Sequence, residues 1–467
     1  MSFKMHKNLA LPSLLALSVA TWLVAGCSSG SSLNGTSANT STGTAFVVGT
    51  DAPMDSVTSF SVQVQSITAT DSNGNSVQLI SGSPTVDFAR FNGLQTLLSL
   101  NNVPAGTYTN VTITLGPATI GYLDTTSSVP TIQTMPATLT TNTVSVTLNN
   151  PLVIANAAAP VGLHVDFSLR KSIQVDSTGQ ITGNVTPTFF VNTVGPDDSG
   201  AHIDEYTAAV VSVDANTQTF VLEGPHGTQI TVAVNGQTEW DGNAGFSDLV
   251  NGAIVQVSGK LDKTTGDLDA DEVELLSRSG FYASGQVTYV TPASGAATSF
   301  DLYVRGLLPT TTGITPGQIA QVDLTGNENF SIYWMHDQMS QFLFNSSLML
   351  PGQDVAVGGP ATGASDPNNV TVNRVVLRNW GFNGTVVPGS VNTSNNTFQM
   401  QVNGFAGILI PQTVTVYIAG ETEYRDGLAD MGGLDTTTNV RVVGVLLKSP
   451  TTGNPIIVAH YVDSQDN

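Results

Sequence analysis

The sequence predicts an all-β protein, and three observations support that prediction. From about residue 45 onward, short runs rich in Val, Ile, Thr and Phe alternate with polar residues, as in residues 60–68 (FSVQVQSIT). Turn-forming pairs such as Asn73-Gly74 separate these runs, and one pattern of residues recurs in the second half of the chain. Alternation with a period of two is typical of half-buried strands, and Asn-Gly between two such runs indicates a hairpin.

The first 26 residues are predicted to be a signal peptide. Lys4 and Lys7 form a basic start, and residues 9–24 are mostly apolar. This order of segments is typical of export signals. The apolar run ends at residues 23–27 (LVAGC), which resembles the site read by bacterial lipoprotein signal peptidase.

Cys27 is therefore predicted to carry a lipid anchor at the start of the mature chain. It is the only cysteine, so no disulfide can form within one molecule. The alternative is a free thiol near the cleavage site. Two acyl chains hold a protein stably on a membrane. We expect a lipid-anchored protein of the bacterial cell envelope, and Ser28 after the cysteine favours the outer over the inner membrane.

The chain is acidic and otherwise sparsely charged. It has 35 Asp and Glu against 14 Lys and Arg, a formal charge of −21, although only 10% of its residues are charged. Loss of Lys4 and Lys7 with the signal peptide takes the mature chain to about −23. Because nucleic-acid binding needs Lys and Arg to neutralise phosphates, nucleic acid is excluded as a partner. Solubility accounts for the acidic excess more simply than attraction of divalent cations does.

Composition also marks the first segments of the mature chain. Residues 27–43 are rich in Ser, Thr, Gly and Asn and are predicted to be a flexible tether. The first folded domain is predicted at residues 44–195, because residues 195–200 (GPDDSG) are a cluster of turn formers.

The elements of this first domain are expected in the following order. Strands are predicted at residues 60–68, 77–80 and 108–115, with a type I′ hairpin turn at Asn73-Gly74 between the first two. One short helical turn is predicted by apolar residues spaced three and four apart: Phe91, Leu94, Leu97 and Leu98.

Short motifs in this domain resemble those of a bacterial family called domain of unknown function 4382. The matching residues are Asp51-Ala52-Pro53, Val86-Asp87 and residues 104–108 (PAGTY), and Val165-Asp166-Phe167 resembles the closing strand of the family. The resemblance implies a β-sandwich of immunoglobulin or transthyretin type, and it implies no activity.

The second half of the chain carries an internal repeat. Residues 231–242 (TVAVNGQTEWDG) align with residues 415–427 (TVYIAGETEYRDG) if one inserted residue is allowed. A more divergent copy lies between them and has Glu328 where the other copies have Thr238 and Thr422. A period of this kind indicates repeated structural units. Three β modules are predicted, at residues 204–278, 280–378 and 380–464.

The three modules resemble a second bacterial family, called domain of unknown function 5666. The resemblance rests on their Gly-rich composition and a Gly-x-Thr-x-aromatic signature, from which the middle copy departs by Glu328 and by an insertion at residues 332–347. It implies small barrels. The predicted architecture is thus an immunoglobulin- or transthyretin-like β-sandwich followed by three small β-barrel-like modules.

Asp267, Asp269 and Asp271 form the pattern closest to a metal site. Alternate carboxylates on an extended segment point to one side, and calcium prefers carboxylate oxygens. The segment lacks the Gly and Glu that complete an EF-hand loop. The apolar residues also change phase after Ala270, which predicts a β-bulge near Asp271. Calcium binding is one hypothesis and a solvated outer face is the other; no other cofactor is expected.

Two aromatic residues are candidates for ligand binding. Trp240 and Tyr424 occupy equivalent positions in the first and third copies, with Phe330 in the middle copy. An exposed ring at this position could stack on a sugar, whereas a buried ring would fill a barrel end, which the preceding turn favours. The insertion holds an apolar set that is either a partner surface or a local core: Trp334, Met335, Met339, Phe342 and Phe344.

No set of acid, base and nucleophile converges in the sequence, so we do not expect an enzyme. Carboxylate pairs such as Glu239 with Asp241 recur at a repeat position, which indicates a fold element. The leading hypothesis is a non-catalytic, lipid-anchored envelope protein with a binding or structural and adhesive role, whose partner is an envelope polysaccharide or a surface protein. The alternative is an extracytoplasmic carbohydrate-binding or carbohydrate-active protein.

Overall fold

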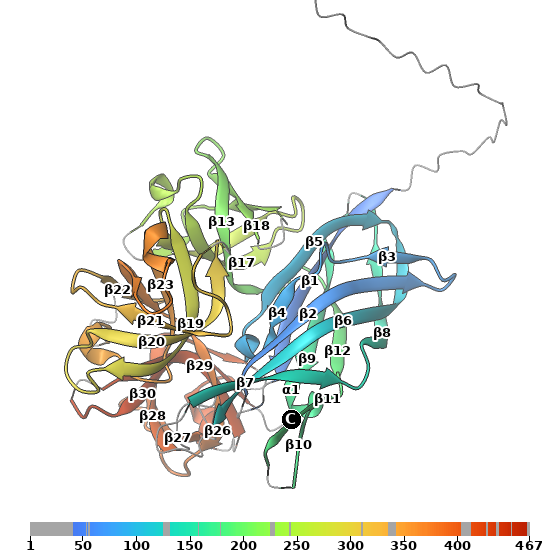
Figure 1. The fold of residues 1–467 in the computed structure, drawn as a ribbon. Coiled ribbons are helices and arrows are strands. Elements are labelled where there is room, and N and C mark those ends of the chain that lie inside the picture. Colours follow the sequence, from blue (N-terminus) through green and yellow to red (C-terminus); the bar gives the residue numbers. More distant parts are fainter. Residues whose placement is uncertain are drawn as a thin grey trace, which may run out of the picture. The chain divides into compact units, whose positions relative to one another are not determined.

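In the structure, a computed structural model, residues 40–467 form one compact unit. All elements below lie in it (Figure 1), and no helix of the described residues is long and apolar enough to cross a membrane. Described are residues 41–464 except 53, 55–56, 125–130, 157, 178, 225–228, 242–243, 310–311, 335–341, 403–411, 426–427, 436–438 and 450, and except the side chains of residues 52, 123, 241, 421 and 435.

Two sheets with one shared core form the first part of this unit. The four-stranded sheet has the order β12 (Phe189–Val194), β9 (Val161–Ser168), β1 (Thr42–Ala52) and β5 (Thr96–Pro104). The eight-stranded sheet has the order β10 (Ile173–Val175), β11 (Ile181–Val185), β7 (Thr131–Leu139), β6 (Gly106–Asp124), β2 (Val57–Asp71) and β3 (Ser76–Gln78), with β4 (Thr85–Asp87) on β2 and β8 (Thr143–Ile154) on β6.

Alternating side chains explain why these two sheets pack together. β2 buries Phe60, Val62 and Val64 in alternation with less buried Ser and Gln, so one side of the strand faces the core. Phe167, from the expected closing strand, stacks on Phe189 with ring centroids 4.4 Å apart and packs edge-on against Phe60. Two sheets on one core make a β-sandwich. Three short helices accompany it: η1 (Phe88–Phe91), α1 (Leu169–Ser172) and η2 (Ser199–Ala201).

Two local predictions for the sandwich need correction. β2 and β3 form the expected hairpin, but only Gly74 has a positive φ (87°), whereas a type I′ turn needs positive φ at both central residues. The Asp71 side chain instead accepts hydrogen bonds from the backbone N–H groups of Asn73 and Asn75, which closes a longer loop. The predicted helical turn was wrong, because Leu97 and Leu98 lie in β5 and only Phe91 belongs to a helix, η1.

The chain continues into three sheets that we call barrels one, two and three (Figure 1, yellow-green to red). Barrel one contains β13 (Ile203–Asp214), β14 (Thr219–Glu223), β15 (Gln229–Ala233), β16 (Glu239–Asp241), η3 (Phe246–Asp248), β17 (Ile254–Leu261) and β18 (Leu268–Ser277). Barrel two contains β19 (Phe281–Thr291), β20 (Ser299–Leu308), β21 (Ile319–Asp323), β22 (Asn329–Ile332), η4 (Ser346–Leu348), β23 (Asp354–Gly359), η5 (Ala361–Ala364), β24 (Val370–Thr371) and β25 (Arg374–Leu377). Barrel three contains β26 (Trp380–Val386), β27 (Thr397–Val402), β28 (Gln412–Arg425), η6 (Met431–Asp435), β29 (Asn439–Lys448) and β30 (Pro455–Ser464).

The three barrels share one pairing order. In barrel three the first strand, β26, pairs with β27 and β29, β28 pairs in parallel with β30, and β29 pairs with β30, so the order first-second-third-fifth-fourth closes on itself. Barrel one closes the same way through the parallel pair β15–β18. In barrel two the fifth strand is split into β24, which pairs with β21, and β25, which pairs with β23.

This order is that of the OB fold, a five-stranded Greek-key barrel. A short 3-10 helix precedes the fourth strand in every barrel, at η3, η4 and η6, where OB folds carry a helix. The predicted all-β class is confirmed, and the predicted insertion in the middle copy does not prevent barrel two from following the same order.

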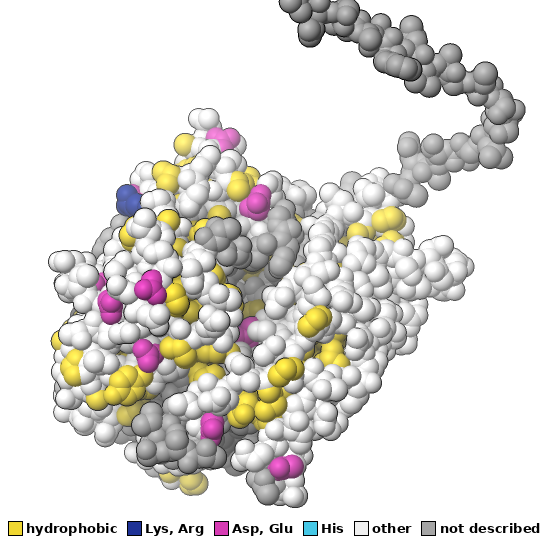
Figure 2. Space-filling view, viewed as in Figure 1, with side chains coloured by type: hydrophobic (Ala, Val, Ile, Leu, Met, Phe, Trp, Pro, Cys, Tyr) yellow, Lys and Arg dark blue, Asp and Glu magenta, His cyan; other side chains and the backbone are white. Residues whose placement is uncertain are grey.

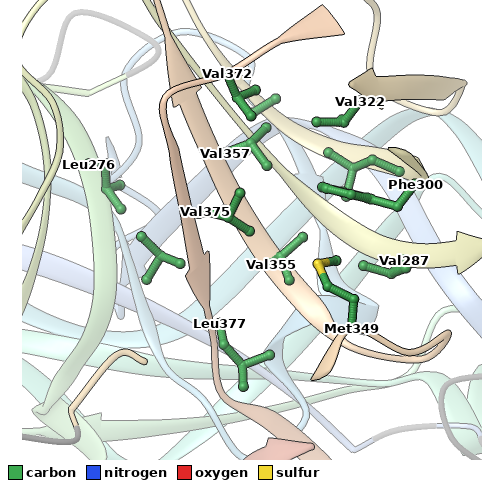
Figure 3. Packing of buried hydrophobic residues seen from close by; sticks show 14 of the residues in the cluster. Leu276, Val287, Phe300, Val322, Met349, Val355, Val357, Val372, Val375 and Leu377 are labelled. Carbon is green, nitrogen blue, oxygen red and sulfur yellow. The ribbon is translucent and has the colours of Figure 1, made fainter. Parts of the chain in front are cut away.

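Buried apolar residues join the parts as well as filling them. Figure 3 shows the core of barrel two, in which Val355 and Val375 lie close together. The same cluster includes Phe300 and also Leu276 of barrel one. The same cluster includes Val445 and Val458 of barrel three. Residues 40–467 therefore pack as one body, not as a string of independent barrels.

Candidate functional site

Six charged side chains from different parts of the chain meet inside this body. We call them the charge ring. Two come from the sandwich, one from barrel one, two from barrel two, and one from the residues between β25 and β26. In order around the ring, their signs alternate: Arg90, Glu205, Arg378, Asp354, Arg305 and Asp87.

The pairs follow one another at ion-pair distances. Arg90 Nη2 lies 3.5 Å from Glu205 Oε2, and Arg378 Nη2 donates to that same oxygen. Arg378 Nη1 lies 4.0 Å from Asp354 Oδ1. Arg305 lies 3.8 Å from both Asp354 and Asp87. Asp87 directly precedes helix η1 and Arg90 lies within it, so the ring closes on the sandwich.

Most of the charged side chains of the ring are almost completely buried, which is unusual for charged residues. Only 1% of the Arg378 side chain and 2% of the Arg305 side chain are exposed. Neutral groups complete their surroundings, because Arg378 Nη1 donates to the Tyr282 hydroxyl at 3.0 Å and the Arg305 guanidinium lies 4.2 Å from the centre of the Trp380 ring. A buried charge is tolerated only when it is paired, and here each ion pairs with a neighbour from another segment.

The backbone of β13 is distorted to bring Glu205 into the ring. Its φ is 48°, in the left-handed region, and the pairing of β13 with β17 shifts register between Ile203 and Tyr206. The Ser258 hydroxyl accepts a hydrogen bond from the Glu205 N–H at 3.0 Å. A non-glycine residue in this region costs energy unless its surroundings hold it there.

Burial shifts the ionisation of the ring carboxyls. It raises the pKa of Glu205 to about 8, with Asp354 and Asp204 adding to the rise and Arg90 opposing it. It raises the pKa of Asp354 to about 7 against the pull of Arg305 and Arg90. The pKa of Asp87 is raised by burial too. Such values are typical of catalytic acids, yet here each carboxyl is held by arginines at an interface between parts of the fold.

The loop before β5 makes a second junction with barrels one and three. Gln95 and Asp204 exchange two hydrogen bonds, at 2.9 and 2.7 Å. The Asn92 side chain donates to the Gly381 carbonyl at 2.7 Å, and the Tyr461 hydroxyl donates to the Gly93 carbonyl at 3.0 Å. Three residues of this loop, Asn92, Gly93 and Gln95, thus fasten the sandwich to two barrels.

The three aspartates proposed for calcium lie along β18 and the loop before it. β18 has a register shift that skips Asp271, so the predicted bulge is present. Asp271 Oδ2 lies 3.4 Å from His202 Nε2, and Asp204 holds the other ring nitrogen of that histidine, which raises its pKa to about 9. In the described part of the chain, no group of three or more His, Cys, Asp or Glu side chains could hold a metal ion.

The repeated aromatic residues lie half-buried at one place in each barrel. Trp240 packs against the core of barrel one, Phe330 against that of barrel two and Tyr424 against that of barrel three. In the first and third barrels a threonine lies two residues before the aromatic residue. Its hydroxyl accepts a hydrogen bond from a backbone N–H three residues earlier. The same hydroxyl donates to a backbone carbonyl of the fifth strand, Thr238 to Ala270 and Thr422 to Ala459. The residues of the repeated signature therefore contribute to the structure of the barrel through core packing and strand hydrogen bonds.

The insertion of the middle copy contributes to a core where it is described. Trp334 is buried and stacks on His460 of barrel three, with ring centroids 4.6 Å apart. Phe342 packs edge-on against Tyr417, and Phe344 is buried. Cys27, Met335 and Met339 lie outside the described residues.

Sequence reasoning did not find the charge ring. The available signal was the scarcity of basic residues: a chain with 14 Lys and Arg places three of its arginines here, each beside apolar neighbours. The partners are far apart in sequence and follow no period, so no pattern connects Arg90 to Glu205 or Glu205 to Arg378.

Comparison with known proteins identifies two segments of the chain. Residues 42–184 match the family model described as domain of unknown function (DUF4382). Residues 208–274 match the model described as domain of unknown function (DUF5666). The DUF4382 resemblance stated from the sequence is confirmed on the sandwich, and the DUF5666 resemblance is confirmed on barrel one, the first of the three modules. Neither description assigns an activity.

Comparisons with single proteins add little. No curated protein matches the chain. Among solved structures, a chain described as "drosophila Unr CSD456" is similar at 11% identity over 56% of this chain and 96% of that chain, with a TM-score of 0.14. A likeness at that score supports no argument about function.

Proposed function

We propose that this protein is a non-catalytic, lipid-anchored component of the bacterial cell envelope that holds a rigid β body at the membrane for binding. The observation that supports this proposal is the charge ring. Its carboxyls have raised pKa values like those of catalytic acids, but Glu205 pairs with Arg90, and Asp87 pairs with Arg305, across the interfaces between the sandwich and the barrels. Carboxyls that are paired with arginines across interfaces join the parts of the fold and are not free to act on a substrate.

The proposed anchor rests on the sequence, because Cys27 follows a signal-like segment and starts a Ser/Thr/Gly-rich tether. A tether of this composition lets the body stand clear of the lipid headgroups. A rigid body on a flexible tether suits a protein that meets polymers or other proteins at the envelope, and its acidity keeps it apart from anionic surfaces.

Membrane fractionation of cells that produce the full chain tests this proposal. We expect the wild-type protein in the membrane fraction and labelled by radioactive palmitate, and Cys27→Ser unlabelled and released. The matched control is Ser28→Ala, which leaves the cysteine in place and should remain membrane-bound. Equal release of wild type and Cys27→Ser would contradict the anchor.

A further inference from the structure

An exposed aromatic residue, a carboxyl and an amide lie side by side on the outside of barrel two. Tyr289 of β19 is paired with Asp301 of β20, which is paired with Gln321 of β21. Residues directly opposite one another on antiparallel strands share one face, with Cβ atoms about 5 Å apart. The Tyr289 side chain is 48% exposed, Gln321 is exposed and Asp301 is half-buried.

Ile319 extends this row into a small surface. It precedes Gln321 by two residues on β21, so it lies on the same face, and it is 42% exposed. In the region where Figure 1 places β19, β20 and β21, Figure 2 shows hydrophobic side chains next to acidic ones. Most exposed apolar residues are single, whereas here two lie around a carboxyl and an amide.

The row lies on the face that OB folds use for ligands. Oligonucleotides and oligosaccharides bind on the second and third strands of this fold, which are β20 and β21 in barrel two. Farther along β20, the sandwich covers the same face: the Tyr303 hydroxyl lies 2.7 Å from the Ser59 hydroxyl, and Arg305 is in the charge ring. Tyr289, Asp301 and Gln321 lie beyond the part of this face that the sandwich covers.

The composition of the row selects between the two ligand classes. None of Tyr289, Asp301, Ile319 and Gln321 is basic, and the body is strongly acidic, which disfavours a phosphate backbone. A half-exposed tyrosine offers a flat ring to the C–H face of a sugar and a hydroxyl to water. The Asp301 carboxylate, which has no hydrogen-bond or ion-pair partner among the described residues, can accept from sugar hydroxyls, and the Gln321 amide can donate and accept.

We propose that Tyr289, Asp301, Ile319 and Gln321 form a binding site for a neutral polysaccharide. This inference rests on the proposed binding function and gives its ligand class. Tyr289 stacks on a sugar ring, Asp301 accepts from adjacent hydroxyls, and Gln321 and Ile319 extend the contact along the chain of the polymer.

Native gel electrophoresis of the mature chain with Cys27→Ser tests the site. The acidic protein enters gels that contain mixed-linkage β-glucan, mannan or glycogen, and binding slows its migration in proportion to the polymer concentration. We expect retardation by at least one of these polymers, binding about tenfold weaker for Tyr289→Ala, and a smaller loss for Asp301→Asn.

Phe190→Ala is the matched control, because Phe190 is an aromatic residue of the sandwich with 44% exposure, outside the proposed site. Its affinity should equal that of the parent protein. Retardation that Tyr289→Ala leaves unchanged would overturn the site, and so would migration unaffected by all three polymers. Pull-down of a surface protein that Tyr289→Ala abolishes, without polymer binding, would assign the surface to a protein partner instead.

The same samples separate failure of this site from failure of the proposed function. Reducing ends released from a polymer would contradict the non-catalytic role even if Tyr289 were needed for binding. Absence of polymer binding would remove only the ligand class, because membrane anchoring is measured independently through Cys27.

Discussion

At the scale of single residues, this protein places ionisable groups where burial, not solvent, sets their pKa values. Glu205 and Asp354 are driven toward the neutral acid, and His460 toward the neutral base. The sign of each shift decides how the stability of the body responds to pH.

Glu205 should make the folded chain less stable as the pH rises. Its pKa is about 8 when folded against an ordinary value of 4.5, so between these values the folded state holds a proton that the unfolded state has lost. Stability from this group is therefore present below about pH 4.5 and lost as the pH rises through 8. Urea unfolding from pH 5 to 9 should show a fall on the order of 1–3 kcal/mol that Glu205→Gln reduces. An unchanged slope in Glu205→Gln would contradict this assignment.

His460 should make the folded chain less stable as the pH falls below neutrality. Burial lowers its pKa to about 4, and the Asn379 amide lies 3.1 Å from its Nδ1 atom while Trp334 stacks on the ring. The unfolded state takes up a proton near pH 6.5 and the folded state does so only near 4, so this stability is present above 6.5 and lost as the pH falls toward 4. Melting temperatures at pH 5 and 7 should differ less in His460→Asn than in wild type. Asn454→Ala, an exposed position in the turn before β30, serves as the control and should keep the wild-type difference.

At the scale of elements, the sequence predicted strands, hairpins and the repeat well because those signals are local. Alternation along β2 and the Asn-Gly pair are read within a few residues, and the recurring threonine keeps the same hydrogen bonds at Thr238 and Thr422. The helical-turn prediction failed because spacing alone does not distinguish a helix from an irregular strand start, and pairing of β5 with β1 decided the conformation of Leu97 and Leu98.

A bulge in the middle of the fifth strand of barrel three, β30, gives a prediction. Opposite this bulge, which skips His460, lies Gly444, where an added Cβ would meet the Val458 carbonyl oxygen at 2.1 Å. The strands cannot separate without breaking the parallel and antiparallel pairs on both sides. Gly444→Ala should therefore lower the free energy of unfolding by more than about 2 kcal/mol.

Gly420→Ala provides the matched test in the same barrel. Nothing lies within 4 Å of the Cβ that this substitution adds, so a change of less than about 0.5 kcal/mol is expected in the same urea titration. A loss in Gly444→Ala as small as that in Gly420→Ala would contradict the close approach at the bulge, because the effect of Gly→Ala on the unfolded chain alone raises stability.

At the scale of the whole molecule, the sandwich and the barrels behave as one body because their joints are buried. The order of parts along the chain followed from the sequence, but their joining did not. Arg378 meets Glu205 from 173 positions away and Tyr461 meets Gly93 from 368 positions away, and no sequence period connects such partners. The acidic composition gave no sign that the few arginines are internal.

Removal of Arg378 is the decisive test of that joint. Arg378→Met keeps much of the buried volume but leaves Glu205 and Asp354 without this partner. At pH 9, where both carboxyls are ionised, loss of one member of a buried ion pair costs about 3–5 kcal/mol. Because Glu205 belongs to barrel one and Asp354 to barrel two, the loss weakens the joint between them. Scanning calorimetry should show one cooperative transition for the wild-type body and a broader or divided transition at lower temperature for the variant.

Two controls make the result specific to the charge ring. Arg278→Met removes an exposed ion pair, since Arg278 donates to Asp248 at 2.7 Å with 65% of its side chain accessible, and it should cost no more than about 1 kcal/mol. Arg378→Met combined with Glu205→Leu removes both members of the Arg378–Glu205 pair and should recover part of the lost stability, because Asp354 is then the one carboxyl left without its Arg378 partner. The contrary result is that the single and double variants have the same melting temperature, lowered only as much as in Arg278→Met. In that case the charge ring does not join the barrels, and the apolar contacts of Leu276 and Val458 join them instead.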